Sequence, residues 1–338
     1  MSQSAIPYCD ETLNVVTGCS GEGCPCAPNP QAETGADRKG RCWARALCHR
    51  FPKLHGGAGY CPECDEGTEP DLPPSPNLEC ENCGSVWRGG PPFSRVVLHP
   101  EALEKLAKAR KPKVWLVSAL GDLFDKQVSF DFVDEVLNLA MLRPEHTLLL
   151  LTKQAERMAA YARDPAHTGY GILGYHLHNL WLGVTVCSQA DADERIPLLL
   201  DTPAAHRWVS YEPALGPVNL TPYIGGRTHQ CRCGFHETEN ELICWGRYFE
   251  CKDCGEKTII RPAVNWVVAG CESGPGARPC PTEWLLNVRQ QCYDAGVKAY
   301  IKQAQYSKWG DPVKRVLVRF EPEPEQLPWT LAKAGPKR

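Results

Sequence analysis

The sequence lacks any long hydrophobic run. Its longest clearly apolar stretch, residues 147–151, is far shorter than the roughly 20 residues that a membrane-spanning helix needs. The amino-terminal segment has neither a basic start nor an apolar core, which argues against a secretory signal peptide. A strong net charge is also missing, since the formal charge is −3, and contact with nucleic acid would therefore require a local basic patch. We expect a cytoplasmic chain without a membrane anchor.

Cysteine, in contrast, is abundant. The chain of 338 residues contains 19 cysteines, an odd number that cannot pair completely within one chain. A chain of this length can bury a full hydrophobic core without covalent cross-links. In a reducing compartment disulfides are rare, so we interpret most of the conspicuous cysteines as thiolate ligands of metals.

Short apolar runs alternate with helical patterns along most of the chain. Runs typical of buried parallel strands are residues 114–117, 147–151, 180–186, 208–211, 266–269 and 298–301, with a weaker opening candidate at 13–16. Helical patterns occupy residues 100–110, 130–141, 155–162, 191–200 and 282–295. This alternation predicts a parallel α/β fold over residues 1–320, either an open sheet or a barrel. Residues 321–338 contain four prolines and are expected to form an irregular, exposed tail.

Two cysteine-rich segments, residues 56–90 and 225–257, interrupt the alternation. Both have too little apolar content for a core of their own, so we expect them to fold around a metal. The first contains two CxxC pairs, and two such pairs complete a tetrahedral zinc site with four sulfur ligands. Its predicted ligands are Cys61, Cys64, Cys80 and Cys83.

The second segment is less regular, because its first cysteine pair is separated by one residue instead of two. Its predicted zinc ligands are Cys231, Cys233, Cys251 and Cys254, with Cys244, His229 and His236 as alternatives. Basic residues nearby form either a phosphate-binding patch or a solvated charged face; they are Arg227, Arg232, Arg247, Lys252 and Lys257.

A third group of cysteines lies near the amino terminus, and its spacing does not match a zinc ribbon. Its members are Cys19, Cys24, Cys26, Cys42 and Cys48. The group follows the first candidate strand, and loops at the carboxyl ends of parallel strands are where α/β folds place their active sites. Cys42 opens a predicted helix, whose amino terminus stabilises thiolates. A third zinc site using Cys19, Cys24, Cys26 and Cys42 remains an alternative interpretation.

Several motifs, taken in order, resemble a known family: the phage and prophage proteins of the radical S-adenosylmethionine type with a three-cysteine motif, long described only as proteins of unknown function. The resemblance covers nearly the whole chain apart from the two cysteine-rich segments and the tail. The matching stretches are Leu13-Asn-Val-Val-Thr-Gly-Cys19, Glu22-Gly-Cys24, Cys42-Trp-Ala-Arg45, and residues 117–124, 151–158, 179–186, 192–198, 209–213, 270–279 and 301–303. The CxxxCxxC motif usual in radical enzymes is absent.

The resemblance implies a partial (β/α)6 barrel with one [4Fe–4S] cluster, carried over to Cys19, Cys24 and Cys42, with Cys26 as an alternative to Cys24. Three thiolates leave one iron open, and by resemblance that iron binds S-adenosylmethionine. One-electron reduction, by a donor such as flavodoxin or ferredoxin, then yields a 5′-deoxyadenosyl radical.

Polar residues at the ends of the predicted strands would meet the cofactor and the substrate at one barrel mouth. Lys153, Glu212 and Asp122 are the candidate catalytic residues. The candidate cofactor-binding residues are Ser118, Asp122, Thr152, Thr185, Glu212 and Glu272. Each of them has the alternative role of closing a salt bridge or capping a helix.

The phage setting implied by the resemblance, together with the predicted ribbons, suggests a base in DNA as the substrate. The most specific hypothesis is hypermodification of a pyrimidine by isomerising an amino-acid-substituted thymidine, in the host cytoplasm if the chain is phage-encoded. Two alternatives remain: a radical DNA-repair lyase acting on damaged thymine, and a non-catalytic zinc-ribbon adaptor that binds nucleic acid. The sequence makes no prediction of the oligomeric state.

Overall fold

The computed structural model describes the secondary-structure core and parts of the inserted segments. The described residues are 6–21, 24, 42, 44, 48, 78–79, 86–87, 95–164, 166–167, 177–224, 229–230, 236–237, 248–250, 257–259, 263–273, 277–308, 311–320 and 326–328. The chain divides into two compact units, Met1–Tyr170 and Gly171–Arg338.

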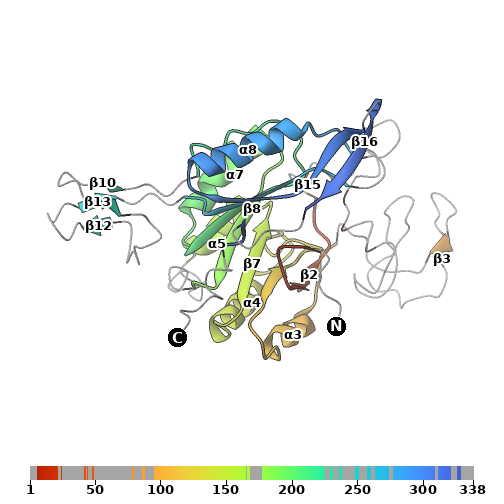
Figure 1. Cartoon of the computed structure of the whole chain (residues 1–338). Coiled ribbons are helices and arrows are strands. Elements are labelled where there is room, and N and C mark those ends of the chain that lie inside the picture. The colour runs from red at the N-terminus through yellow and green to blue at the C-terminus, as the bar shows by residue number, and fades with distance from the viewer. Residues whose placement is uncertain are drawn as a thin grey trace. The chain divides into compact units, whose positions relative to one another are not determined.

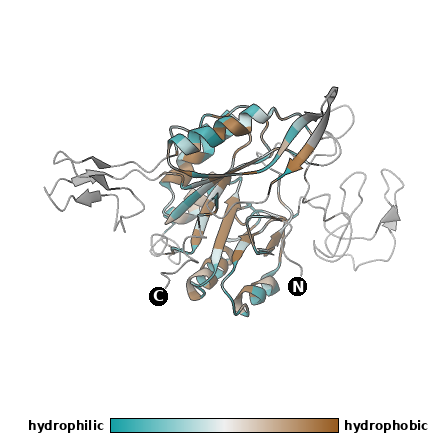
Figure 2. Ribbon diagram, viewed as in Figure 1, coloured by the Kyte–Doolittle hydropathy of each residue, from teal (hydrophilic) through white to brown (hydrophobic). Residues whose placement is uncertain are grey.

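The first unit is built on three parallel strands, shown in Figure 1 in red to yellow-green. They are β1 (Glu11–Leu13), β6 (Val114–Val117) and β7 (Thr147–Thr152), in the order β1-β6-β7. Leu13 pairs with Val117, and Val114 pairs with Thr147. Strands β6 and β7 are almost wholly buried, which explains why they are continuous apolar runs, and β7 is correspondingly brown in Figure 2.

The helices of the first unit follow these strands. A 3-10 turn, η2 (Pro100–Ala102), leads into α3 (Leu103–Ala107), and α4 (Phe130–Leu142) and α5 (Ala155–Arg163) come after β6 and β7. Helix α4 begins at Ser129, whose hydroxyl accepts a hydrogen bond from Phe132 N at 3.3 Å. Its buried residues recur at helical spacing: Phe132, Val133, Val136, Leu137 and Ala140.

The second unit is built on four parallel strands and one antiparallel edge strand. The parallel strands, in sheet order, are β8 (Leu180–Thr185), β9 (His206–Tyr211), β14 (Trp266–Gly270) and β15 (Lys298–Lys308). Strand β16 (Asp311–Arg319) runs antiparallel beside β15. Helix α7 (Gln189–Asp201) packs on β8 and β9, and α8 (Thr282–Asp294) packs on β14 and β15.

Within each unit the parallel strands lie side by side in the order of the sequence. A doubly wound sheet would reverse its strand order at a switch point, whereas a singly wound sheet or barrel adds each new strand on the same side. The predicted mixed α/β class with parallel strands is confirmed, and all six main apolar runs are strands.

The structure differs from the sequence prediction at three places. Residues 13–16 do not form one strand, because β1 pairs with β6 while β2 (Val16–Thr17) turns away to pair antiparallel with β5 (Val97–Leu98). Strand β16 was not predicted. The tail is anchored at two carbonyl groups, since Gln326 O accepts from Trp266 Nε1 at 2.9 Å and Leu327 O accepts from Lys298 Nζ at 3.4 Å.

The two inserted segments contain short antiparallel hairpins. Strands β3 (Leu78–Glu79) and β4 (Val86–Trp87) pair in the first insertion. In the second, β10 (His229–Gln230) pairs with β11 (His236–Glu237), and β12 (Tyr248–Glu250) pairs with β13 (Lys257–Ile259). Among the described residues, no helix is both long and apolar enough to cross a membrane.

Candidate cysteine site

Cys19, Cys24 and Cys42 come together in the first unit although 23 positions separate the first from the last. Both Cys42 and Cys24 lie close enough to Cys19 to interact with its charge. Burial is the largest cause that raises the pKa of the Cys19 thiol to about 12, and the neighbouring thiols raise it further. Burial and the neighbouring sulfurs therefore disfavour the thiolate form of Cys19 when no cation is bound.

The loop that carries Cys19 is tied to the loop after β6. Gly18 N donates to Leu120 O at 3.0 Å, and Gly18 forms a parallel bridge with Gly121. A Cβ atom at Gly121 would lie 2.7 Å from Val16 O and 2.9 Å from Gly18 O, so only glycine permits this close approach. Farther along the loop, Ser20 N donates to Asp125 Oδ2 at 2.7 Å. The cysteine loop therefore lies at the carboxyl end of β6.

Asp122 and Lys153 border the same site. Asp122 is buried and accepts hydrogen bonds from the Thr152 hydroxyl at 2.7 Å, Lys153 N at 2.9 Å and Phe124 N at 3.0 Å. Burial raises the pKa of Asp122, while these hydrogen bonds and the charge of Lys153 oppose the increase. The Lys153 ammonium also acts on Cys19 and favours its thiolate. The ends of β6 and β7 thus contribute one carboxyl group and one cation next to the cysteines.

Ser118 has two unusual features. It is a non-glycine residue with a positive φ of 55°, and its buried hydroxyl has no hydrogen-bond partner among the described residues. Such a conformation costs energy and is concentrated at ligand-binding sites. The hydroxyl of Ser118 is available to a ligand, whereas that of Thr152 is occupied by Asp122 and by Gln154 N.

The spacing of the cysteines bears on which metal group they fit. Among the described residues, the sulfurs of Cys19, Cys24 and Cys42 do not all lie within 4.8 Å of one another. Thiolates around one zinc ion lie roughly 3.8 Å apart, because each Zn–S bond is about 2.3 Å long. Zinc ions and iron–sulfur clusters both accept thiolate ligands, so the residue types of this group suit either one.

Cys48 is a neighbour of this group that the sequence left without a role. It is fully buried with Ala44 and Leu120, and Cys19 and Cys42 pack against this small cluster. Burial raises the pKa of Cys48 to about 12, and proximity to Cys42 contributes. None of the nine described cysteines is in a disulfide bond.

The remaining predicted site residues of the core lie in the second unit. Glu212 follows β9, and its Oε1 accepts from Lys302 Nζ at 2.8 Å and from Gln303 Nε2 at 3.5 Å. Both contacts use the same oxygen, so Oε2 remains available within the described part of this unit. Thr185 ends β8 and is buried, and its carbonyl accepts from Arg195 at 2.9 Å.

Glu272 is already bound to Arg278. The guanidinium Nε lies 3.1 Å from both carboxylate oxygens, and Arg278 N donates to Oε2 at 2.8 Å. This arrangement favours a structural role for Glu272 in its loop over direct binding of a cofactor.

The eight predicted zinc ligands, Cys61, Cys64, Cys80, Cys83, Cys231, Cys233, Cys251 and Cys254, lie outside the described residues. Three of the four cysteine pairs nevertheless fall between two strands that pair with each other. Cys80 and Cys83 follow β3, Cys231 and Cys233 follow β10, and Cys251 and Cys254 follow β12. In the sequence each of these three cysteine pairs therefore stands between two paired strands.

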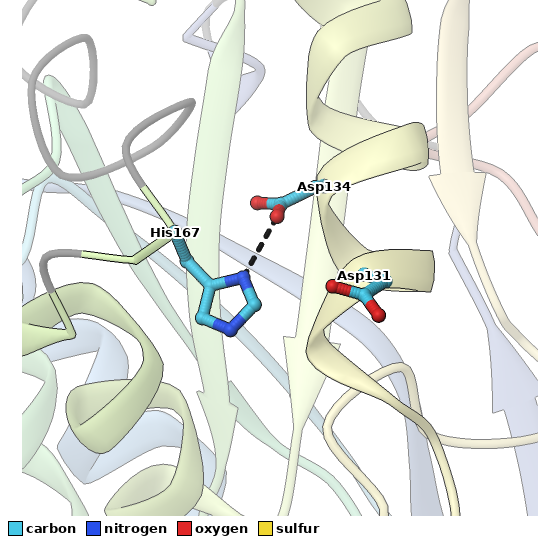
Figure 3. Close-up of side chains that lie close together, drawn as sticks. All are labelled: Asp131, Asp134 and His167. Atoms are coloured by element: carbon cyan, nitrogen blue, oxygen red, sulfur yellow. Dashed lines mark hydrogen bonds and ion pairs between the residues drawn. The ribbon is translucent and has the colours of Figure 1, made fainter.

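A second group of possible metal ligands lies in the first unit, with Asp131 and Asp134 on α4 and His167 after α5 (Figure 3). Asp131, Asp134 and His167 offer ligand atoms within 4.8 Å of one another. His167 Nδ1 and Asp134 Oδ2 are 2.7 Å apart, and this pairing is the main cause that raises the pKa of His167. The His167 ring also packs against Phe130 and Tyr161. These contacts account for the group without a metal.

Sequence reasoning did not identify Asp125, Lys302 or Gln303 as parts of these sites. Asp125 directly follows the matching stretch 117–124, and Lys302 and Gln303 directly follow the apolar run 298–301 inside β15. A polar residue directly after an apolar run was the signal available for the latter two.

A comparison with protein-family models found a match. A family model described as "Protein of unknown function (DUF5131)" matches residues 3–325, which includes most of both units and both insertions. Neither the curated proteins nor the solved structures yielded a match.

Proposed function

Since the chain belongs to the DUF5131 family of proteins of unknown function, its activity must be argued from its own residues, and we propose that it is a radical S-adenosylmethionine enzyme with one [4Fe–4S] cluster. The observation that carries this proposal is the convergence of Cys19, Cys24 and Cys42 beside the carboxyl ends of β6 and β7. The sequential order of the parallel strands supports a partial (β/α)6 barrel as the framework.

In this proposal Cys19, Cys24 and Cys42 hold the cluster, which leaves one iron for S-adenosylmethionine. When bound, the cluster and S-adenosylmethionine together supply a 5′-deoxyadenosyl radical. The positive charge of Lys153 stabilises a thiolate at Cys19. The Asp122 carboxylate holds the backbone of Lys153 in place by accepting a hydrogen bond from Lys153 N. The free hydroxyl of Ser118 is a hydrogen-bond donor for the bound nucleoside or amino acid.

Glu212 has a separate role in this proposal. Lys302 and Gln303 hold one of its carboxylate oxygens, and the other is able to accept from an ammonium or a ribose hydroxyl group. Thr185 is kept as a weaker candidate, and Glu272 is a positioning residue because Arg278 occupies its carboxylate.

The two insertions are proposed to be zinc ribbons that contact DNA, with a pyrimidine base as the substrate. The hairpins around three cysteine pairs support the ribbons. The specific reaction proposed is isomerisation of an amino-acid-substituted thymidine in phage DNA, with flavodoxin or ferredoxin as the electron donor. A cytoplasmic location is part of this proposal and agrees with the absence of disulfide bonds among the described cysteines.

Anaerobic purification followed by iron and sulfide analysis tests the proposal. We expect a brown protein with about four iron ions per chain, the number in a [4Fe–4S] cluster. The triple variant Cys19→Ala, Cys24→Ala, Cys42→Ala should lose this iron. The matched control Cys9→Ala, Cys187→Ala, Cys292→Ala removes three buried cysteines elsewhere and should keep it.

A colourless anaerobic protein that carries only zinc would contradict the enzyme and support an adaptor. Reductive cleavage of S-adenosylmethionine to 5′-deoxyadenosine then tests the radical chemistry. Mass spectrometry of nucleosides from phage or host DNA, with and without the gene, identifies the substrate. A change confined to damaged thymine would replace the isomerase hypothesis with a repair lyase.

A further inference from the structure

The hydroxyl of Ser20, the residue after Cys19, is buried and has no hydrogen-bond partner among the described residues. Leaving a buried hydroxyl without a hydrogen-bond partner is energetically unfavourable. A hydroxyl beside a proposed cluster ligand would gain that energy back if it donated to a bound group. No predicted function had been assigned to Ser20.

The backbone on both sides of Ser20 is held firmly, so the position of its hydroxyl is determined by the fold. Gly18 and Gly21 have φ angles of 78° and 73°, which reverse the chain before and after the Cys19–Ser20 pair. Cys24 N donates to Gly21 O at 3.1 Å and closes the turn on the other side.

Asp125 is the main anchor of this turn. It is 1% exposed, and its two oxygens accept from different backbone groups: Oδ2 from Ser20 N at 2.7 Å and Oδ1 from Gln127 N at 3.0 Å. Ser20 N donates to Asp125. The next N–H group, that of Gly21, donates a hydrogen bond to the sulfur of Cys19. The turn therefore presents one N–H group and one free O–H group close to the first cysteine ligand.

Hydrogen bonds to the sulfur atoms of an iron–sulfur cluster stabilise its more negative, reduced form and so raise its reduction potential. We propose that the turn Cys19–Gly21 sets the reduction potential of the cluster: the Gly21 N–H and the Ser20 hydroxyl donate to sulfur atoms, and Asp125 is the positioning residue. This inference rests on the proposed function, because it requires a cluster at Cys19.

The first test is a redox titration of the cluster, followed by electron paramagnetic resonance, in the anaerobic full-length protein. Ser20→Ala removes one hydrogen bond to a charged acceptor, so the ratio of reduced to oxidised cluster at a fixed potential should fall about tenfold, which equals 59 mV for one electron. Ser20→Thr keeps a hydroxyl and should retain the wild-type potential. Equal potentials for wild type and Ser20→Ala would overturn the role of the hydroxyl.

The second test separates positioning from charge. Asp125→Asn and Asp125→Ala both remove a negative charge near the cluster, which raises the potential equally. Only the asparagine retains an oxygen that can accept from Ser20 N, so the alanine variant should have the lower potential of the two. Equal potentials in these two variants would overturn the positioning role of Asp125.

The outcomes also distinguish this inference from the function on which it rests. A wild-type protein that binds no iron under anaerobic conditions overturns both. A wild-type protein that binds about four iron ions, with equal potentials for the two Ser20 variants and equal potentials for the two Asp125 variants, overturns only the role of the turn.

Discussion

The hydroxyl of Thr152 donates a hydrogen bond to Oδ1 of Asp122 at 2.7 Å, and this contact joins the carboxyl ends of β7 and β6. Two backbone N–H groups, from Lys153 and Phe124, bind the same carboxylate. The loops that border the cysteine site are therefore held by one buried side chain.

Replacing Asp122 should destabilise the first unit. Asp122→Ala leaves three buried donors without an acceptor, and we expect a loss of at least about 2 kcal/mol in the free energy of unfolding. Thr152→Val, which removes only one donor from this carboxylate, is the matched control and should cost less. Urea denaturation at neutral pH measures both variants, and an Asp122→Ala variant as stable as Thr152→Val would contradict the interpretation.

Lys302 should affect ligand binding through Glu212. Lys302→Met removes the cation that holds Oε1 at 2.8 Å, so Glu212 loses its fixed orientation. We expect about tenfold weaker binding of S-adenosylmethionine, equivalent to about 1.4 kcal/mol, by equilibrium dialysis. Lys298→Met, on the same strand, removes a cation that contacts the tail and should leave binding unchanged.

The choice between Cys24 and Cys26 has a direct test. Cys24 is one of the residues whose charge acts on Cys19, so Cys24→Ala should lower the iron content of the anaerobic protein. Cys26→Ala should leave it near the wild-type value. The reverse result would assign Cys26 as the third ligand, and iron loss in both variants would indicate that both cysteines support the site.

Removal of the zinc ligands should disturb the two insertions and leave the core intact. We expect two zinc ions per chain, one of which is lost in Cys80→Ala, Cys83→Ala. The other should be lost in Cys251→Ala, Cys254→Ala. Because the parallel strands have their own buried core, both double variants should keep the iron of the wild-type protein. Metal analysis of the purified variants measures this, and simultaneous loss of iron and zinc would contradict independent folding of the insertions.

Two histidines should give the stability opposite dependences on pH. Burial lowers the pKa of His206 to about 4, and its ring stacks on the ring of Trp181 with the two centroids 4.3 Å apart. In the unfolded chain the pKa of this histidine is about 6.5. Between pH 6.5 and pH 4 the unfolded state therefore binds more protons than the folded state. The free energy of unfolding should fall by up to about 3 kcal/mol as the pH decreases through this range. His206→Phe preserves the stacked ring and should remove this loss.

Asp134 raises the pKa of His167 in the folded protein. The contribution of this pair to the free energy of unfolding is therefore present below pH 6.5 and is lost as the pH rises through the folded-state pKa of His167. His167→Gln should remove that second dependence, with the opposite sign to His206→Phe. Urea denaturation between pH 5 and pH 8 compares the two variants with the wild type, and slopes of the same sign would contradict the assignment.

Much of the fold was predictable because buried parallel strands need apolar side chains on both faces. The run at 147–151 is β7, and helix α4 matches its predicted pattern to within one residue. The helix predicted over residues 100–110 is shorter, because α3 ends at Ala107 before a basic stretch that leads to Pro112. Strand β16 was not found in this way, since its sequence, Asp311–Arg319, mixes charged and apolar residues and is not a continuous apolar run.

The sequence by itself determined the strand and helix alternation, the unusual supply of cysteine and the polar residues at strand ends, because these depend on residue type and local spacing. Only the tertiary structure decided which of them meet. It brought Cys42 to Cys19 across a long intervening segment, placed Asp125 against Ser20, and committed Glu272 to Arg278. Contacts between residues far apart in the chain depend on how strands pair and loops close, which local sequence patterns do not encode.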